Sequence, residues 1–221
     1  MVEAGLGAIP TAPPAAAKVV GTAGLATSTT APSAEVALPA IAAAIAACQN
    51  CALGAERQNS VAGEGNPNAR LMFVGESPGA EEDRSGRPFV GAAGQLLEKI
   101  LENGMGLTRA EVFITNLVKC RPPQNRDPLP QEVCACTPFL EQQIAAVNPE
   151  LLIALGRPAA HHLLQTAAPI SELRGKILKR PQDGLPILVT DHPALLLYEP
   201  ARKADCWADI QVAMRFLGLT K

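Results

Sequence analysis

The cysteines are the residues whose type and spacing point most directly to chemistry. They are Cys48, Cys51, Cys120, Cys134, Cys136 and Cys206. The first two stand in the C-x-x-C spacing of CQNC, a turn geometry that lets two thiolates hold one metal ion or one face of a cluster. The cysteine of VKCRPP and the pair in VCACTPF could supply the remaining ligands. This pattern favours a site in which thiolates bind a metal or a cluster.

Spacing alone does not identify the group that the thiolates would hold. Zinc and a four-iron cluster both accept four cysteine ligands. Buried free thiols are the alternative, and they account well for Cys206 and for one member of the Cys134 and Cys136 pair. Disulfides are the less expected use, because the chain shows no secretion signal.

A second group of polar residues lies where apolar runs end. These residues are Glu76 in GESPG, Asn116 in VFITNLV and His192 in TDHPALL. Each residue alone is more often a loop, strand-end or structural residue than a functional one. Ligands of open α/β sheets bind in the crevice outside the carboxyl ends of the strands. Because all three residues fall at corresponding strand ends, we expect them to converge on one pocket.

Alternating strands and helices are needed to bring these residues together. Four runs rich in branched residues predict strands that are buried on both faces: LMFV at 71–74, VFITNLV at 112–118, LLIAL at 151–155 and PILVT at 186–190. Apolar residues at helical spacing lie at about 95–101, after Pro130, after Gly156 and at about 204–217. We therefore expect an α/β fold with three α/β/α layers around a central, mostly parallel, four-stranded sheet.

Composition divides the chain into a tail and a globular part. Residues 1–40 are almost entirely Ala, Pro, Gly, Thr, Ser and Val, so we expect a disordered tail there and one domain at 41–221. That domain holds eighteen Lys or Arg against nineteen Asp or Glu, which argues against whole-surface attraction to nucleic acid. No apolar run approaches the ~20 residues of a membrane span, so a soluble, cytoplasmic protein is expected.

Two local basic runs contrast with this neutral balance. The first run contains Lys119, Arg121 and Arg126, and the second contains Arg174, Lys176, Lys179 and Arg180. No acidic residue interrupts either run. On charge alone, each run is more typical of a solvated face than of a binding site.

Five longer segments resemble family 4 uracil-DNA glycosylases, the iron–sulfur branch of the uracil-DNA glycosylase superfamily. The segments are CQNCALGAERQNSV, GESPGAEEDRSGRPFVGAAGQLL, FITNLVKCRPPQNRDP, CTPFLEQQIAAVNPELLIALG and TDHPALLL. They follow one another in the expected order between Cys48 and about Trp207. The resemblance implies a monofunctional glycosylase that hydrolyses the N-glycosidic bond of uracil in single- and double-stranded DNA and so starts base excision repair. It also implies a 4Fe-4S cluster, uracil-containing DNA as the partner, and a monomer.

The same resemblance implies roles for individual residues. The cluster ligands of the family match Cys48, Cys51, Cys120 and Cys136. The uracil site would comprise Gly75, Glu76 in the water-activating motif, Phe89 stacked on the base, Asn116 as the base-reading amide and His192 at the pyrimidine O2. The expected DNA contacts are Lys119, Arg121 and Arg126, the basic run at 174–180, and Pro193, Leu195 and Leu196 in a segment that resembles a duplex-inserting wedge.

The residue types suit this chemistry. Cleavage of an N-glycosidic bond develops positive charge on the sugar and negative charge on the departing base. A carboxylate such as Glu76 can stabilise the cation and orient a water molecule, and a donor such as His192 can stabilise the base anion at O2. An amide donates and accepts at once, so Asn116 can match uracil where cytosine presents the reverse pattern. The base must first leave the duplex, at a cost of a few kcal/mol.

Three other interpretations deserve comparison with this one. A uracil-crosslinking relative would need a histidine in an inserted basic loop, and RPPQNRDP contains neither. A catalytically silent DNA-binding or partner-recruiting iron–sulfur module of the same fold is disfavoured by the presence of all four site residues named above. A zinc-thiolate domain without enzymatic activity would explain the cysteines but would leave the strand-end residues without a role.

Overall fold

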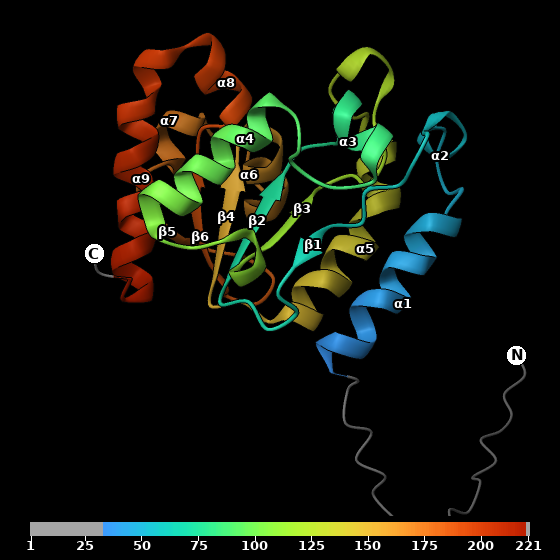
Figure 1. The fold of residues 1–221 in the computed structure, drawn as a ribbon, viewed down its shortest axis with the longest axis horizontal. Coiled ribbons are helices and arrows are strands. Elements are labelled where there is room, and N and C mark those ends of the chain that lie inside the picture. The colour runs from blue at the N-terminus through green and yellow to red at the C-terminus, as the bar shows by residue number, and fades with distance from the viewer. Residues whose placement is uncertain (1–32, 220–221) are drawn as a thin grey trace, which may run out of the picture. The chain divides into compact units, whose positions relative to one another are not determined.

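The computed structural model describes residues 33–219. Within them lies one mixed sheet of six strands in the order β1-β3-β2-β4-β6-β5 (Figure 1). The strands are β1 Glu64–Gly65, β2 Leu71–Gly75, β3 Phe113–Asn116, β4 Leu151–Leu155, β5 Ile177–Lys179 and β6 Pro186–Thr190. The central strands β3, β2, β4 and β6 run parallel, and β1 and β5 pair antiparallel at the edges.

The parallel centre confirms the α/β prediction, but the prediction of only four strands was wrong. Both additional strands are short edge strands. Strand β1 is two residues long and ends in a glycine, and the residues of β5 are partly or fully exposed. Neither segment contains the continuous apolar run by which a doubly buried strand is recognised in a sequence.

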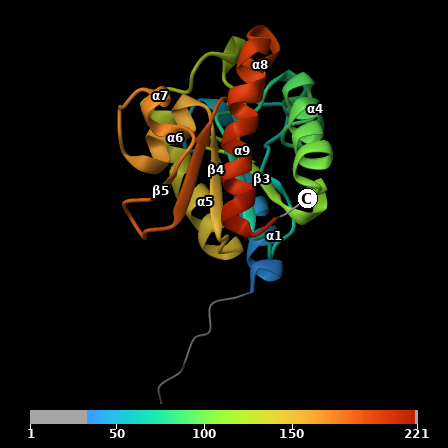
Figure 2. The ribbon, with the colours of Figure 1, turned by 90° about the vertical axis from the view of Figure 1, so that its left-hand side faces the viewer.

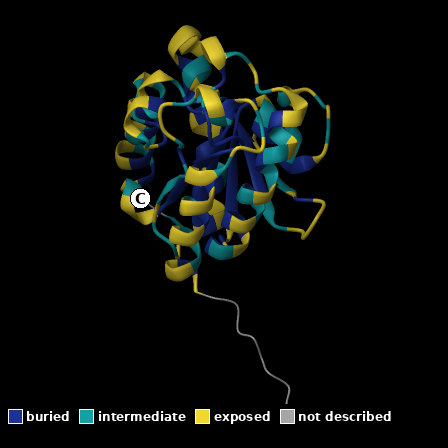
Figure 3. Cartoon of the chain, turned by 90° about the vertical axis from the view of Figure 1, so that its right-hand side faces the viewer, coloured by how far each residue is buried: buried dark blue, intermediate teal, exposed yellow. Residues whose placement is uncertain are grey.

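Both faces of the central sheet are buried. Successive side chains of a strand point to opposite faces, so Met72 and Val74 join one apolar cluster, whereas Leu71 and Phe73 join the other. Figure 3 shows the strands in the buried colour, with exposed residues on the outward sides of the helices. This two-sided burial explains why β2 is apolar throughout.

Helices cover the two faces of the sheet. They are α1 Ala34–Ala47, α2 Leu53–Glu56, α3 Ala80–Ser85, α4 Ala92–Lys99, α5 Pro130–Val147, α6 Arg157–Leu164, α7 Ile170–Leu173, α8 Pro193–Tyr198 and α9 Lys203–Leu217. The apolar residues of α5 and α6 belong to one cluster, and those of α4 and α9 belong to the other. Figure 2 shows α4 and α6 on opposite sides of the sheet.

Helix α1 changes the expected boundary of the tail. It begins at Ala34, packs along α5 and buries Ile41 and Ile45, so residues 34–40 belong to the folded part (Figure 1). The rest of the predicted tail lies outside the described residues. Between residues 33 and 219, no helix combines the length and the apolar character needed to cross a membrane.

Candidate active site

One cleft opens at the carboxyl ends of β2, β3 and β6. Its volume is about 270 Å³, and it is lined by Glu76, Phe89, Asn116 and His192 together with residues of the neighbouring loops and helix ends. The prediction that Glu76, Asn116 and His192 converge on one pocket is therefore confirmed. Phe89 reaches the cleft from the loop between α3 and α4 and not from the end of a strand. The chemical role of each side chain stays a prediction.

Glu76 is a half-buried carboxyl group just beyond β2. Burial raises its pKa from 4.5 to about 6, and the negative charge of Asp127 adds to the rise. Arg157 opposes this effect, and its guanidinium also forms an ion pair with Asp127 at 3.3 Å. Because burial disfavours the ionised form, Glu76 changes its charge close to neutral pH.

His192 precedes α8 and is held by the first turn of that helix. The backbone N–H of Ala194 donates to its Nδ1 at 3.1 Å. Burial lowers the pKa of His192 to about 4, so the imidazole is neutral at neutral pH. With Nδ1 acting as an acceptor, the single ring proton of the neutral form resides on Nε2. The ring lies 5.6 Å from that of Phe89, centroid to centroid, at an angle of 34°.

Asn116 is the last residue of β3 and is only 1% exposed. Its side-chain oxygen is buried and has no hydrogen-bond partner within the described part of the chain. Buried polar atoms are normally paired, so this orphaned acceptor at the cleft is suited to a ligand donor. Gly75 lies alongside, and a Cβ atom there would overlap both this oxygen and the ring of Phe89. Glycine is therefore required beside the site.

The structure contradicts the prediction that Lys119 contacts DNA phosphates. Lys119 is 1% exposed, and its ammonium donates to Thr115 Oγ1, Asn116 O and Gln143 Oε1 at 2.6–2.7 Å. All three donors of the ammonium are thereby satisfied inside the protein. Burial lowers the pKa of Lys119 to about 7. The residue ties α5 to the strand end that carries Asn116, so its role is structural.

The remaining predicted DNA contacts are only partly exposed. Arg121 donates to Asn125 Oδ1 at 2.8 Å, and Arg126 pairs with the buried Glu132 at 2.7 Å. In the second basic run, Arg174 and Arg180 are engaged by buried or half-buried carboxylates, whereas Lys176 and Lys179 are exposed. The prediction of a wholly DNA-facing second run was therefore wrong for its two arginines.

The predicted wedge also needs correction. Pro193 and Leu196 are buried, and Leu196 is 1% exposed because it packs into the cluster beneath α4 and α9. Leu195 is half-buried. The next residues along α8 face the solvent instead, with Leu197 43% and Tyr198 86% exposed. The side chains predicted for the wedge are therefore not the most exposed ones of this helix, and its insertion into a duplex stays a prediction.

Four of the six cysteines line one small cavity of about 20 Å³. They are Cys48, Cys51, Cys120 and Cys136, contributed by the α1–α2 connection, the loop after β3, and α5. Cys134 is exposed and does not line the cavity, and Cys206 is a buried thiol elsewhere. The geometry thus distinguishes the two cysteines of VCACTPF. Among residues 33–219, no three His, Cys, Asp or Glu side chains converge tightly enough for a single metal ion.

Hydrogen-bond donors surround the cysteine cavity. Arg57 Nη1 donates to Cys120 Sγ at 3.0 Å, and the backbone N–H of Lys119 donates to Cys136 Sγ at 3.2 Å. Burial raises the pKa of both thiols, that of Cys136 to about 11. Donors directed at sulfur favour thiolates, which are the form that binds iron. The donor set therefore fits an iron–sulfur cluster.

Sequence reasoning missed four polar residues of the cleft: Ser77, Glu82, Asn125 and Asp127. Asn125 ends the short 3-10 helix Pro123–Asn125 with a φ of 54°, and Asp127 follows it in the loop before α5. Asn is one of the few non-glycine residues that adopt this left-handed conformation readily. The NRD sequence was therefore a signal for a sharp turn, although it gave no indication of where the turn would lie.

Comparisons with known proteins agree with this geometry. A model of the Uracil DNA glycosylase superfamily matches residues 62–211, which contain the whole cleft, and so defines the class of protein. The chain is 47% identical to a type-4 uracil-DNA glycosylase of Saccharolobus solfataricus over 74% of this chain and 78% of the relative. Identity to the type-4 enzyme of Pyrobaculum aerophilum is 45%, over 77% and 89% of the two chains. The chain belongs to the type-4 uracil-DNA glycosylases.

Proposed function

We propose that this cleft hydrolyses the N-glycosidic bond between uracil and deoxyribose in DNA. Family membership makes the chain a uracil-DNA glycosylase, a hydrolase of N-glycosyl bonds that acts in base excision repair. The observation that carries the residue-level proposal is the grouping of Glu76, Phe89, Asn116 and His192 around one cleft. The reaction leaves an abasic site, and the proposed chemistry breaks no sugar–phosphate bond.

Glu76 acts on the sugar side of the bond. The transition state has oxocarbenium character, which an ionised carboxylate stabilises while it orients the attacking water. This role requires the deprotonated form, which predominates above the pKa of about 6. Asn125 and Asp127 line the same part of the cleft and provide further polar contacts for that water.

His192 and Asn116 act on the base. The proton on Nε2 of the neutral His192 can donate to uracil O2, where negative charge develops as the bond breaks. The unpaired oxygen of Asn116 can accept from uracil N3–H, while its NH₂ group can donate to O4. Cytosine presents an acceptor at N3 and a donor at N4, so it would leave the buried amide mismatched. Phe89 provides the apolar wall against which the base lies.

The four cavity cysteines would hold a 4Fe-4S cluster. Cys48, Cys51, Cys120 and Cys136 supply the four thiolates that such a cluster requires. The cluster contributes iron–thiolate bonds that join the α1–α2 connection to α5 and to the loop after β3. Hydrolysis transfers no electrons, so the cluster would have a structural role: it would stabilise the loop that carries Arg121 and Asn125.

DNA would lie across the face on which the cleft opens. A uracil must leave the helical stack to reach Asn116, which costs a few kcal/mol and costs least in single strands or mismatches. The partly exposed Arg121 and the exposed Arg157 and Lys176 are available for phosphates. Lys179 pairs with Pro186 at the amino end of β6 and therefore lies away from the cleft. With so few free cations, binding should be modest and sensitive to salt.

The test is release of uracil from a single-stranded oligonucleotide, read as alkali-labile strand breakage, beside an identical strand that carries thymine. We expect breakage in the uracil strand alone, and a large loss of breakage in E76A and N116A. Brown, folded protein that breaks neither strand would overturn the proposal in favour of a silent DNA-binding module. Breakage without alkali would contradict the monofunctional mechanism.

A further inference from the structure

Phe89 has an unusual backbone conformation. Its φ is 51°, in the left-handed region that bulky residues rarely occupy. The side chain is nevertheless buried, with its ring between Gly75 and His192. Such conformations persist only where the surrounding structure enforces them, and they concentrate at functional sites. The position of the ring therefore depends on whatever holds this turn.

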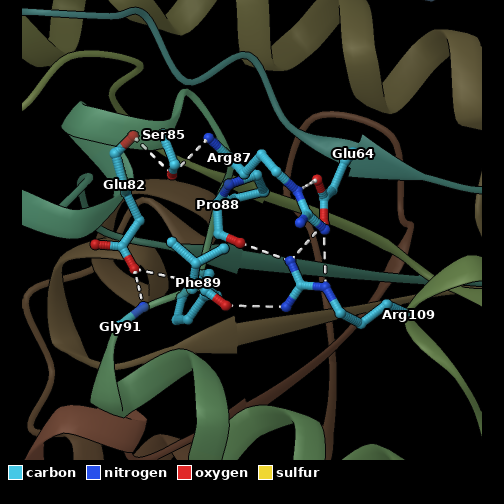
Figure 4. Close-up of polar contacts among 9 residues, drawn as sticks. Glu64, Glu82, Ser85, Arg87, Pro88, Phe89, Gly91 and Arg109 are labelled. Carbon is cyan, nitrogen blue, oxygen red and sulfur yellow. Dashed lines mark hydrogen bonds and ion pairs between the residues drawn. The ribbon is translucent and has the colours of Figure 1, made fainter.

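Glu82 holds the turn from one side. Its carboxylate accepts from the backbone N–H groups of Val90 and Gly91 at 2.8 Å and from that of Gly79 at 3.1 Å. Figure 4 shows the bond to Gly91. The glutamate extends from α3, so one side chain links this helix to the residues immediately after Phe89. These are charge-assisted bonds, which are about twice as strong as neutral ones.

Arg109 holds the turn from the other side. It lies in the short 3-10 helix Arg109–Glu111, and its guanidinium donates to Phe89 O at 2.9 Å and to Pro88 O at 2.6 Å. Glu64 of β1 fixes the guanidinium through an ion pair at 2.6 Å (Figure 4). The side chain of Arg109 is only 16% exposed, so the pair is well shielded from water. A rigid fork of donors thus binds two consecutive carbonyls.

We propose that Glu82 and Arg109 are positioning residues that keep the Phe89 ring in place as the wall of the uracil site. This inference rests on the proposed role of Phe89 in binding uracil. Glu82 also lines the cleft, but its carboxylate bonds to backbone N–H groups, and Arg109 bonds to two backbone carbonyls, so each acts on the backbone that carries the ring. Helix α4 packs closely against this turn, since a Cβ atom at Gly94 would overlap the Phe89 carbonyl. Loss of either set of bonds would let φ relax and withdraw the ring.

Arg87 provides a matched control. Its guanidinium pairs with the same Glu64 at 2.8 Å, but the side chain is 60% exposed. None of its hydrogen bonds within the described chain reaches the carbonyl of Pro88 or Phe89. Substitution by lysine at either arginine preserves the charge beside Glu64 but removes the planar fork. Only at Arg109 does this change break the bonds to the turn.

The experiment measures competitive inhibition by free uracil, together with kcat, KM and Tm, in the full-length protein. For E82Q and R109K we expect the inhibition constant for uracil to rise on the order of 10-fold, as release of a strained turn implies. R87K should stay within about twofold of the unsubstituted protein. A purely structural role would lower Tm without this selective loss of uracil binding, and that result would overturn the proposal.

A double-mutant cycle with F89A tests whether the effect acts through the ring. If Glu82 acts by positioning Phe89, E82Q should weaken uracil binding by less than about twofold when F89A is already present. Equal effects of E82Q with and without the ring would overturn the proposal. If F89A alone leaves uracil binding unchanged, the role of Phe89 fails instead, and with it the premise of the inference. The two failures are therefore distinguishable.

Discussion

Glu76 links catalysis to stability, because the burial that raises its pKa affects both. The proposed role requires the ionised carboxylate, and its pKa is about 6. We therefore expect the rate of uracil release to fall about tenfold for each pH unit below 6, with roughly a tenth of the enzyme active at pH 5. Asp127→Asn should move this profile to lower pH, because the charge of Asp127 raises the pKa.

The same shift predicts a stability penalty for the ionised group. Glu76 ionises at its ordinary pKa of 4.5 in the unfolded chain and at about 6 in the fold, so the folded protein binds this proton more tightly. The resulting stabilisation is fully present below pH 4.5 and is lost as the pH rises through 6. The shift corresponds to about 2 kcal/mol, and solvent screening in the open cleft reduces this to about 1 kcal/mol.

Glu76→Gln separates the two effects. At pH 8 the variant should be about 1 kcal/mol more stable than the unsubstituted protein, because the amide never ionises. At pH 4.5 the gain should be less than about 0.5 kcal/mol, since the carboxyl group of the folded protein is then protonated. Its single-turnover rate at pH 8 should fall about 100-fold or more, and the remaining activity should lose its dependence on pH near 6.

Urea denaturation at the two pH values measures stability, and single-turnover cleavage of a uracil oligonucleotide measures the rate. Glu102→Gln, an exposed glutamate outside the cleft, is the control and should change neither quantity. The reasoning is refuted if Glu76→Gln is destabilised at pH 8, or if its rate keeps the inflection near pH 6. A stability gain that is equal at both pH values would show that packing, and not charge, is responsible.

Three further predictions concern the corrected residues. Lys119→Met should lower the free energy of unfolding by about 2–3 kcal/mol, because it leaves buried acceptors unpaired. An unchanged urea midpoint, together with a weaker dependence of DNA binding on salt concentration, would show instead that Lys119 contacts phosphates. Cys136→Ser should lose the visible absorbance of the cluster, whereas Cys134→Ser should keep it; bleaching of both variants would contradict the cavity assignment. Tyr198→Ala should slow cleavage of double-stranded more than of single-stranded uracil DNA, and equal slowing of both would exclude a wedge at this position.

The fold was predictable to the extent that its strands are apolar on both faces. Strand β2 could be recognised because both of its faces are buried, and the same holds for β4. The edge strands could not be recognised. Strand β1, for example, consists only of a glutamate and a glycine, so it contains no apolar residues that would indicate a strand. Residues 34–40 were assigned to the tail because the stretch 1–40 is almost entirely Ala, Pro, Gly, Thr, Ser and Val; in the structure they form the first half of α1, which packs against α5.

The site residues were predictable where the direction of the strands alone determines the position of a side chain. Parallel strands bring their carboxyl ends to one edge of the sheet, which placed Glu76, Asn116 and His192 together. Lys119 was misinterpreted because its burial depends on Gln143, which α5 brings from 24 residues further along the chain. Leu196 was misassigned because the sequence did not show which side of α8 faces the core. Successive residues of a helix are rotated by about 100°, so neighbouring side chains point in different directions.

Three departures from ordinary folding rules lie at the cleft. Phe89 has a strained backbone, Asn116 has a buried oxygen without a partner, and Glu76 ionises at a cost in stability. Each feature alone disfavours the folded state, yet all three line the same cleft. A sequence selected for stability alone would remove such conflicts, and proteins retain them chiefly at functional sites. Uracil would remove one of these conflicts directly, because its N3–H is the donor that the Asn116 oxygen lacks. The features that destabilise the fold without substrate are therefore those that would make the cleft complementary to uracil.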